Sequence, residues 1–150
     1  MSFRRLKILS LLMMLVFLFC ACGKKGPPLA PRQEFTLMIK DLQGEWRNGD
    51  LQLAGLLKGV KKDEKVSDLV ETCRVYYGKY SLSDPPCDGC PINLQGFYEF
   101  KAADVIANGE FTCTLPISEQ QYIYYFEIRL VSIGEELGPP SNRIKIELKD

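Results

Sequence analysis

The chain begins with one long apolar run and continues with short segments in which apolar and polar residues alternate. The run covers Ile8 to Ala21 (ILSLLMMLVFLFCA), and Ser10 is its one polar interruption. From residue 35 on, apolar residues recur at every second position, the pattern of strands with one buried face. The expected strands cover residues 35–46, 51–57, 73–77, 97–100, 111–115, 122–130 and 144–148. Seven short strands without a sustained helical period predict an all-β sandwich over residues 35–150.

The connections between these segments carry turn signals. Asn48-Gly49 separates the first two expected strands, and this pair favours a two-residue hairpin because both residues tolerate a positive φ. Residues 59–71 hold seven charged side chains, so we expect a solvated loop there, with at most one helical turn around residues 67–70. The segment SDPPCDGCP at 83–91 ends the third strand.

The N-terminal apolar run has the composition of a secretory signal. Arg4, Arg5 and Lys7 form a basic segment before it. At 1.5 Å per residue this run of 14 residues is too short for a comfortable membrane span. We expect residues 1–21 to be a leader that is removed; an uncleaved N-terminal anchor is the alternative.

The end of the leader, Phe19-Cys20-Ala21-Cys22-Gly23, resembles the lipobox of bacterial lipoproteins. This resemblance implies cleavage after Ala21 and acylation of Cys22 with fatty acids such as palmitate, so that the membrane becomes a partner through a lipid anchor. In that family, Asp after the acylated cysteine retains the protein in the inner membrane. Gly23 stands there, which implies the periplasmic face of the outer membrane, with the outer leaflet of the inner membrane as the alternative.

A tether is expected at residues 22–34. The run GKKGPPLAPR contains two glycines and three prolines and favours an extended segment. Its opening, CGKKGPP, is similar to the head of small outer-membrane lipoproteins that accompany the lipopolysaccharide-transport machinery. That similarity implies an accessory role in lipopolysaccharide transport, whereas a generic spacer is the plainer interpretation.

The charged residues exclude several functions. The chain has 19 basic and 19 acidic residues and no histidine. A nucleic-acid partner is not expected, because phosphate binding requires a basic excess. Without histidine the common hydrolytic triads are excluded. We find no catalytic residues, resident metal site or cofactor motif, and we therefore predict a non-enzymatic binding or scaffolding module with an envelope protein as partner.

The C-terminal third carries a second resemblance. Cys73-Arg74-Val75-Tyr76-Tyr77, Leu115-Pro116, Tyr122 to Leu130 and Gly138-Pro139-Pro140-Ser141-Asn142-Arg143 resemble strand and corner segments of the fibronectin type III family. The resemblance implies a seven-stranded immunoglobulin-like sandwich. It also implies that Tyr122 or Tyr124 is the tyrosine-corner residue; the sequence leaves the choice open.

Four cysteines remain after the leader and Cys22: Cys73, Cys87, Cys90 and Cys113. An even number in an oxidising compartment favours two disulfides. We expect Cys73 to pair with Cys113, since both lie on apolar strand faces in opposite sheets, and Cys87 to pair with Cys90. Disulfides that join Cys87 and Cys90 to Cys73 and Cys113 are the alternative. A zinc site formed by the same four cysteines is the least favoured interpretation.

Cys87-Asp88-Gly89-Cys90 also allows a redox function, that of a thiol-disulfide protein. A thioredoxin-like CxxC places its first sulfur at a helix N-terminus, which stabilises the thiolate. Here prolines flank the motif and Asp88 adds a negative charge, so the redox function ranks second to a structural bridge.

Tyrosines supply the candidate binding surface. Tyr76 and Tyr125 point away from the core on the expected alternation, and Tyr98 lies in the short fourth strand. Tyrosine is enriched where proteins meet, so Tyr76, Tyr98 and Tyr125 are predicted to form an exposed aromatic patch.

Overall fold

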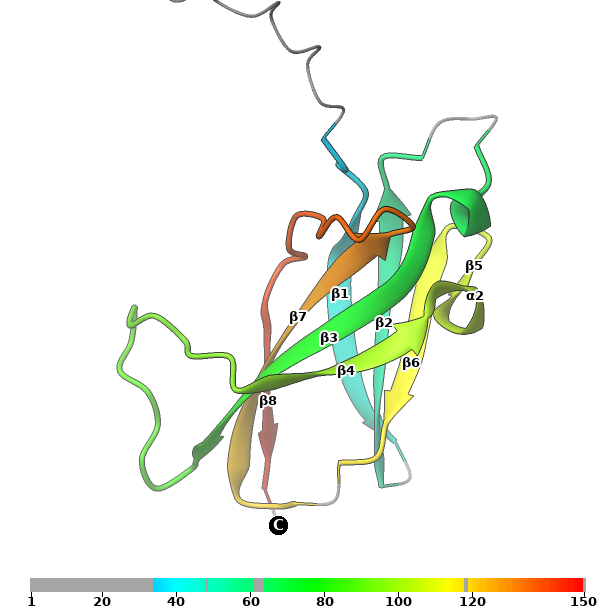
Figure 1. The fold of residues 1–150 in the computed structure, drawn as a ribbon. Coiled ribbons are helices and arrows are strands. Elements are labelled where there is room, and N and C mark those ends of the chain that lie inside the picture. The colour runs from blue at the N-terminus through cyan, green and yellow to red at the C-terminus, as the bar shows by residue number, and fades with distance from the viewer. Residues whose placement is uncertain (1–33, 48, 61–63, 118, 150) are drawn as a thin grey trace, which may run out of the picture. The chain divides into compact units, whose positions relative to one another are not determined.

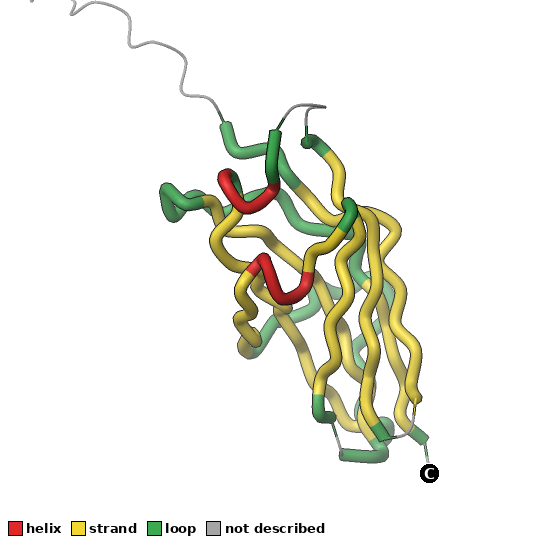
Figure 2. The backbone as a smooth tube through the Cα atoms, turned by 90° about the vertical axis from the view of Figure 1, so that its right-hand side faces the viewer, coloured by secondary structure: helices red, strands yellow, loops and turns green. Residues whose placement is uncertain are grey.

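The computed structural model describes residues 34–47, 49–60, 64–117 and 119–149. These residues form two antiparallel four-stranded sheets, in which the strand orders are β1-β2-β6-β5 and β4-β3-β7-β8 (Figures 1 and 2). The strands are β1 (Met38–Arg47), β2 (Asp50–Lys58), β3 (Val70–Ser81), β4 (Gly96–Lys101), β5 (Ile106–Ala107), β6 (Glu110–Leu115), β7 (Tyr122–Ser132) and β8 (Ile144–Leu148). The predicted all-β sandwich is confirmed.

The β1–β2 hairpin forms where Asn48-Gly49 predicted it. Arg47 pairs with Asp50 across the two-residue turn, and Gly49 has a φ of 89°. The register shifts between Lys40 and Gln43 because β1 contains a bulge, at which Asp41 has a φ of 54°. After the bulge, β1 and β2 stay in register to the turn.

Three short elements were not among the expected strands. A single turn of 3₁₀-helix, η1 (Val66–Asp68), lies in the charged loop, close to the helical turn that we expected there. A short helix, α2 (Ala102–Val105), follows β4 and leads into the two-residue strand β5. β5 turns into β6 through Asn108-Gly109, whose φ values of 52° and 80° are those of a type I′ hairpin turn. The described residues therefore form eight strands, one more than the seven expected from the sequence.

The core lies between the two sheets. In β3 the buried Cys73 and Val75 alternate with the half-exposed Arg74 and Tyr76, as the period-two pattern predicted. In β7 the alternation is weaker, because Ile123, Glu127 and Val131 are buried on the opposite face as well. Each large apolar side chain that is fully removed from water contributes about 1.5–3 kcal/mol relative to an exposed one. The largest fully buried side chains are Phe111, Phe126, Ile39, Leu51, Leu53, Leu115, Ile128, Leu130, Val75 and Cys73.

The expected bridge between Cys73 and Cys113 is absent. The two residues do lie in opposite sheets, Cys73 in β3 and Cys113 in β6, but both are free and buried. Burial raises the pKa of both thiols to about 12, so both stay protonated, and the thiolate that disulfide formation requires is not formed. Both thiols instead fill the core as small apolar side chains.

Residues 1–33, which include the predicted leader, Cys22 and almost the whole tether, lie outside the described residues. Within the described part of the chain, no helix has the length and apolar character needed to span a bilayer. The same residues contain no group of three or more Cys, Asp or Glu side chains arranged to hold a metal ion.

Candidate binding surface

The outward face of the β4-β3-β7-β8 sheet carries aromatic and charged side chains. In β3, Cys73 and Val75 point into the core, so Arg74 and Tyr76 point outward. Arg74 pairs with Glu99 of β4, and Tyr76 pairs with Phe97. Directly opposite residues of antiparallel strands share a face. We call this surface the outer face; its residues are Arg74, Tyr76, Gly78, Tyr80, Phe97, Glu99, Tyr125, Glu127, Arg129, Arg143 and Lys145.

Two of the three predicted tyrosines meet on the outer face. Tyr76 pairs with Glu127 of β7, and Tyr125 lies two residues before Glu127 along the same strand. Tyr76 and Tyr125 are therefore diagonal neighbours. Tyr125 also receives the edge of the Tyr80 ring, with 5.9 Å between the ring centroids.

Tyr98 does not join them. It pairs with Val75, whose side chain is buried, and its ring lies 5.3 Å from that of Tyr77 on the inward side of the sheet. There it lines a cavity of about 240 Å³ together with Lys79, Glu119 and Tyr124. Partial burial raises the pKa of its phenol.

Phe97 takes the place that we expected for Tyr98. Its side chain is 47% exposed, and its ring centroid lies 5.3 Å from that of Tyr76. The predicted patch included Tyr98 from this strand and did not include Phe97. The alternation along GFYEFK gives Phe97 and Glu99 one face and Tyr98 and Phe100 the other, so the signal was present.

Arg74 links the aromatic and charged parts of the outer face. Its Nε donates a hydrogen bond of 2.6 Å to Glu99, and its guanidinium lies 4.9 Å from the centroid of the Phe97 ring. The hydrogen bond to Glu99 is the main reason that the pKa of Arg74 is raised. The guanidinium is thus held over an aromatic ring while the Arg74 side chain stays 33% exposed, so it remains accessible to a partner.

Glu127 organises the other half of the surface. Its side chain is only 6% exposed and accepts hydrogen bonds from Arg129 Nε at 3.2 Å and Arg143 Nη2 at 2.9 Å. Two half-exposed arginines therefore cover one buried carboxylate. This pairing fixes the orientation of both guanidinium groups next to Tyr76 and Tyr125.

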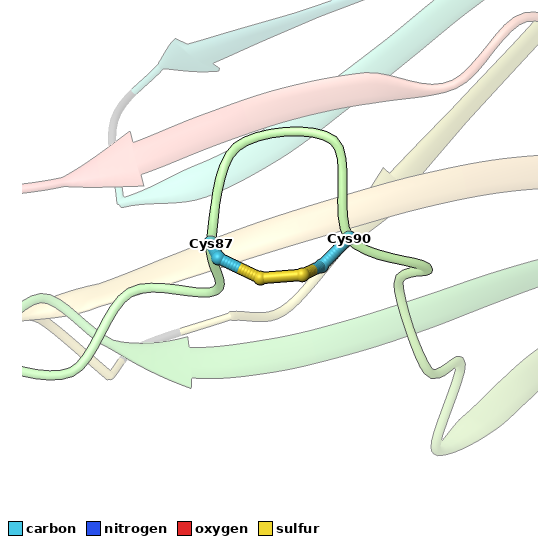
Figure 3. The surroundings of a disulfide bond; sticks show 2 residues. All are labelled: Cys87 and Cys90. Atoms are coloured by element: carbon cyan, nitrogen blue, oxygen red, sulfur yellow. A yellow bond between two sulfur atoms is a disulfide. The ribbon is translucent and has the colours of Figure 1, made fainter.

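The 82–95 loop connects β3 to β4 and contains the predicted Cys87–Cys90 disulfide (Figure 3). The Cys90 N–H donates to the Cys87 carbonyl at 3.1 Å, and Gly89 has a φ of 79°, which is the geometry of a type II turn. Both cysteines are exposed. The motif is a turn and not a helix N-terminus, so the local feature that stabilises a thioredoxin-like thiolate is missing.

The loop returns along β3. The Tyr80 hydroxyl accepts a hydrogen bond from the Asn93 N–H at 2.9 Å and donates to the Asn93 carbonyl at 3.2 Å. A Cβ atom at Gly78 would lie 2.7 Å from the same carbonyl oxygen, so only glycine allows this close approach. At the Cys87–Cys90 turn, earlier in the loop, Asp88 lies close enough to Lys145 to add to the rise in the pKa of Lys145, which is caused mainly by Glu147.

Comparison with known proteins gives fold neighbours only. No family model matches the chain, and no curated protein matches it. The third fibronectin III domain of the human KIAA0343 protein matches with a TM-score of 0.50 at 17% identity, over 85% of this chain and 94% of that one. The fold is fibronectin type III-like.

Two further solved structures are more distant. One is described as a myokine and matches with a TM-score of 0.47 at 11% identity, over 77% of this chain and all of that chain. The other is the pectate lyase Pel3 from Pectobacterium carotovorum, with a TM-score of 0.43 at 14% identity over 74% of this chain. The match spans only 27% of the lyase.

Proposed function

We propose that this protein is a lipid-anchored envelope lipoprotein whose fibronectin type III-like sandwich is a non-enzymatic binding module. The lipobox-like segment Phe19 to Gly23 and the Gly/Pro-rich tether support the anchor. Cys22 is the residue that would be acylated, and the outer membrane's periplasmic face is the proposed location. Several acyl chains on one cysteine would make the attachment effectively permanent, since each buried methylene contributes about 0.8 kcal/mol.

The outer face is the proposed contact surface for an envelope protein. The observation that carries this proposal is the row formed by Phe97, Tyr76 and Glu127, beside Arg74. Aromatic residues and arginine dominate the binding energy of protein interfaces. Here they are already oriented by ring contacts and ion pairs, so binding would immobilise few side chains.

Capture of partners from native envelopes tests the contact surface. We expect the Tyr76→Ala/Phe97→Ala variant to lose its partner by tenfold or more in affinity, because hot-spot residues each contribute 1 kcal/mol or more. Leu56→Ala is the matched control, since Leu56 is 40% exposed but lies in β2 of the other sheet. Equal capture of the partner by both variants would contradict the outer face as the contact surface.

Metabolic labelling with palmitate tests the anchor. We expect label in the wild type and in Cys20→Ala, and none in Cys22→Ala. The Cys20 variant is the control because the two cysteines are two positions apart in the same segment. Label that persists in Cys22→Ala would contradict the proposed acylation site.

A thiol-disulfide function is the second candidate, favoured by the exposure of both Cys87 and Cys90. The reduction potential of the Cys87–Cys90 pair distinguishes a redox function from a structural one. A structural bridge should have a reduction potential below about −300 mV and so stay oxidised in a glutathione buffer, whereas a working redox pair should have a reduction potential of about −120 to −270 mV.

An accessory role in lipopolysaccharide transport is supported only by the CGKKGPP head. If that head contacts the transport machinery, replacing residues 23–29 with a Gly/Ser segment of the same length should abolish crosslinking to it. The outer-face variants should leave such crosslinking unchanged.

A further inference from the structure

The edges of the two sheets differ in how well they are protected against pairing with another chain. At the β1 edge, the bulge at Asp41 interrupts the strand. Beside it, the Asn142 side chain accepts a hydrogen bond from the Leu42 N–H and donates one to the Leu42 carbonyl. A bulge and a covering side chain both block strand addition.

The β8 edge is protected by charge. Lys145 and Lys149 each form an ion pair with Glu147, at 2.7 and 3.0 Å. The start of β6 is covered by β5, and its next outward side chains are the polar Thr112 and Thr114. These features are the usual means by which natural sheets avoid edge-to-edge association.

The β4 edge, Gly96–Lys101, has no bulge in its register with β3 and no strand covering it among the described residues. Its charged residues are Glu99, which is bonded to Arg74 of β3 on the outer face, and Lys101 at its last position. β4 is the last strand of its sheet and pairs only with β3. It contains no proline and carries two exposed aromatic residues, Phe97 at 47% and Tyr98 at 37% exposure. An open edge with large apolar side chains is a site for strand addition.

We propose that the β4 edge pairs antiparallel with the β4 edge of a second copy of this chain, about a two-fold axis at Tyr98. In this register Tyr98 lies opposite Tyr98 of the second copy, and Phe97 lies opposite Glu99. Residues opposite each other must share a face, and both pairs satisfy this condition, because Phe97 and Glu99 are both on the outer face. The contact is isologous, as two-fold symmetry requires.

Charge complementarity supports the second copy as the occupant. Arg74 lies over Phe97 and bonds to Glu99 within one copy. Pairing about Tyr98 would bring Glu99 of each copy next to Phe97 of the other, and hence next to the other copy's Arg74. Each carboxylate would then lie between two guanidinium groups. A two-fold axis at Glu99 would instead place two carboxylates opposite each other, which is unfavourable.

The pairing would join the two β4-β3-β7-β8 sheets into one continuous sheet. Both exposed aromatic residues of β4 would be covered, and the outer faces of the two copies would lie side by side. This inference does not depend on the lipid anchor or on an envelope partner.

Cysteine crosslinking in intact cells tests the pairing with the full chain. We expect Tyr98→Cys, treated with copper phenanthroline, to give a band at twice the monomer mass on a non-reducing gel, because opposite Cα atoms in antiparallel strands lie within disulfide range. Lys145→Cys, on the β8 edge, is the matched control and should stay monomeric. Crosslinking of Glu99→Cys without crosslinking of Tyr98→Cys would overturn the proposed register about Tyr98. A crosslinked band that contains a different protein would overturn the proposal that a second copy of this chain pairs with β4.

Sedimentation of the purified full chain gives an independent measurement. We expect the wild type to dimerise and Tyr98→Lys to remain monomeric, because the substitution places two ammonium groups opposite each other. Tyr98→Phe should dimerise like the wild type. A wild type that stays monomeric in sedimentation, together with a Tyr98→Cys variant that does not crosslink, overturns the proposal.

Discussion

Asn142 completes the hydrogen bonding of Leu42, a residue 100 positions earlier in the chain. Its amide oxygen accepts from the Leu42 N–H at 2.8 Å, and its amide nitrogen donates to the Leu42 carbonyl at 2.9 Å. One side chain thus acts as a strand partner for the β1 bulge and ties the first sheet to the segment that leads into β8.

Replacing this amide should destabilise the sandwich. We expect Asn142→Ala to lower the free energy of unfolding by about 1–3 kcal/mol, because a part-buried N–H and carbonyl lose their partner. Chemical denaturation measures the change. Gln43→Ala, at an exposed position of the same strand β1, should change stability by about 0.5 kcal/mol or less. Equal effects of the two substitutions would contradict this role of Asn142.

Gly78 should be intolerant of a side chain. A Cβ atom there would lie 2.7 Å from the Asn93 carbonyl oxygen, so Gly78→Ala must push the 82–95 loop away from β3. We expect a loss of about 1–3 kcal/mol in denaturation and chemical-shift changes at Asn93. Gly134→Ala is the control, since its nearest neighbouring atom would be 3.7 Å away. An unchanged Asn93 signal in Gly78→Ala would refute the close contact.

Removal of the Cys87–Cys90 bridge should have a modest cost. The bridge closes a ring of only four residues, for which the chain-entropy relation gives about 2 kcal/mol. We expect Cys87→Ser/Cys90→Ser to fold and to lose up to that amount in denaturation. Loss of folding in this variant would mean that the bridge supports more than its own turn.

The two buried thiols should make stability fall at alkaline pH. Burial raises the pKa of Cys73 and of Cys113 from an ordinary value near 9 to about 12. Between pH 9 and 12 the unfolded chain therefore loses protons that the folded chain retains, so the free energy of unfolding decreases as pH rises. Below pH 9 this contribution is constant.

Denaturation at a series of pH values measures this decrease, and Cys73→Ala/Cys113→Ala should have a shallower slope. Tyr98 and Tyr124, whose pKa values burial also raises, will leave a residual slope in the same direction. In the folded wild type at pH 8 we expect no labelling of Cys73 or Cys113 by iodoacetamide. Rapid labelling would show that the thiols are more accessible than their burial implies.

Local sequence signals predicted much of the fold, because strand alternation and turn chemistry act over a few residues. Asn48-Gly49 located the first hairpin. Asn108-Gly109 also joins two paired strands but was missed, because the strand before it has only two residues and follows a turn of helix. A periodic pattern cannot be recognised over two positions.

The candidate site was harder to predict, because it depends on pairs of residues that are distant in the sequence. The alternation placed Tyr76 and Tyr125 outward, but only the strand register made them neighbours. Cys73 and Cys113 were assigned to opposite sheets, yet that assignment does not give the separation between their sulfur atoms. Burial of Glu127 likewise required Arg143, which arrives from the segment before β8.

The closed ring at Cys87–Cys90 holds the tip of the 82–95 loop together by a covalent bond of its own. An added side chain at Gly89 would meet no atom within 4 Å, and the loop is attached to β3 further along, at Asn93. Foreign residues inserted between Asp88 and Gly89 should therefore be displayed without disturbing the sandwich. The tip offers a position for an epitope or a fluorescent label, and it is a place where the sequence is free to diversify during evolution.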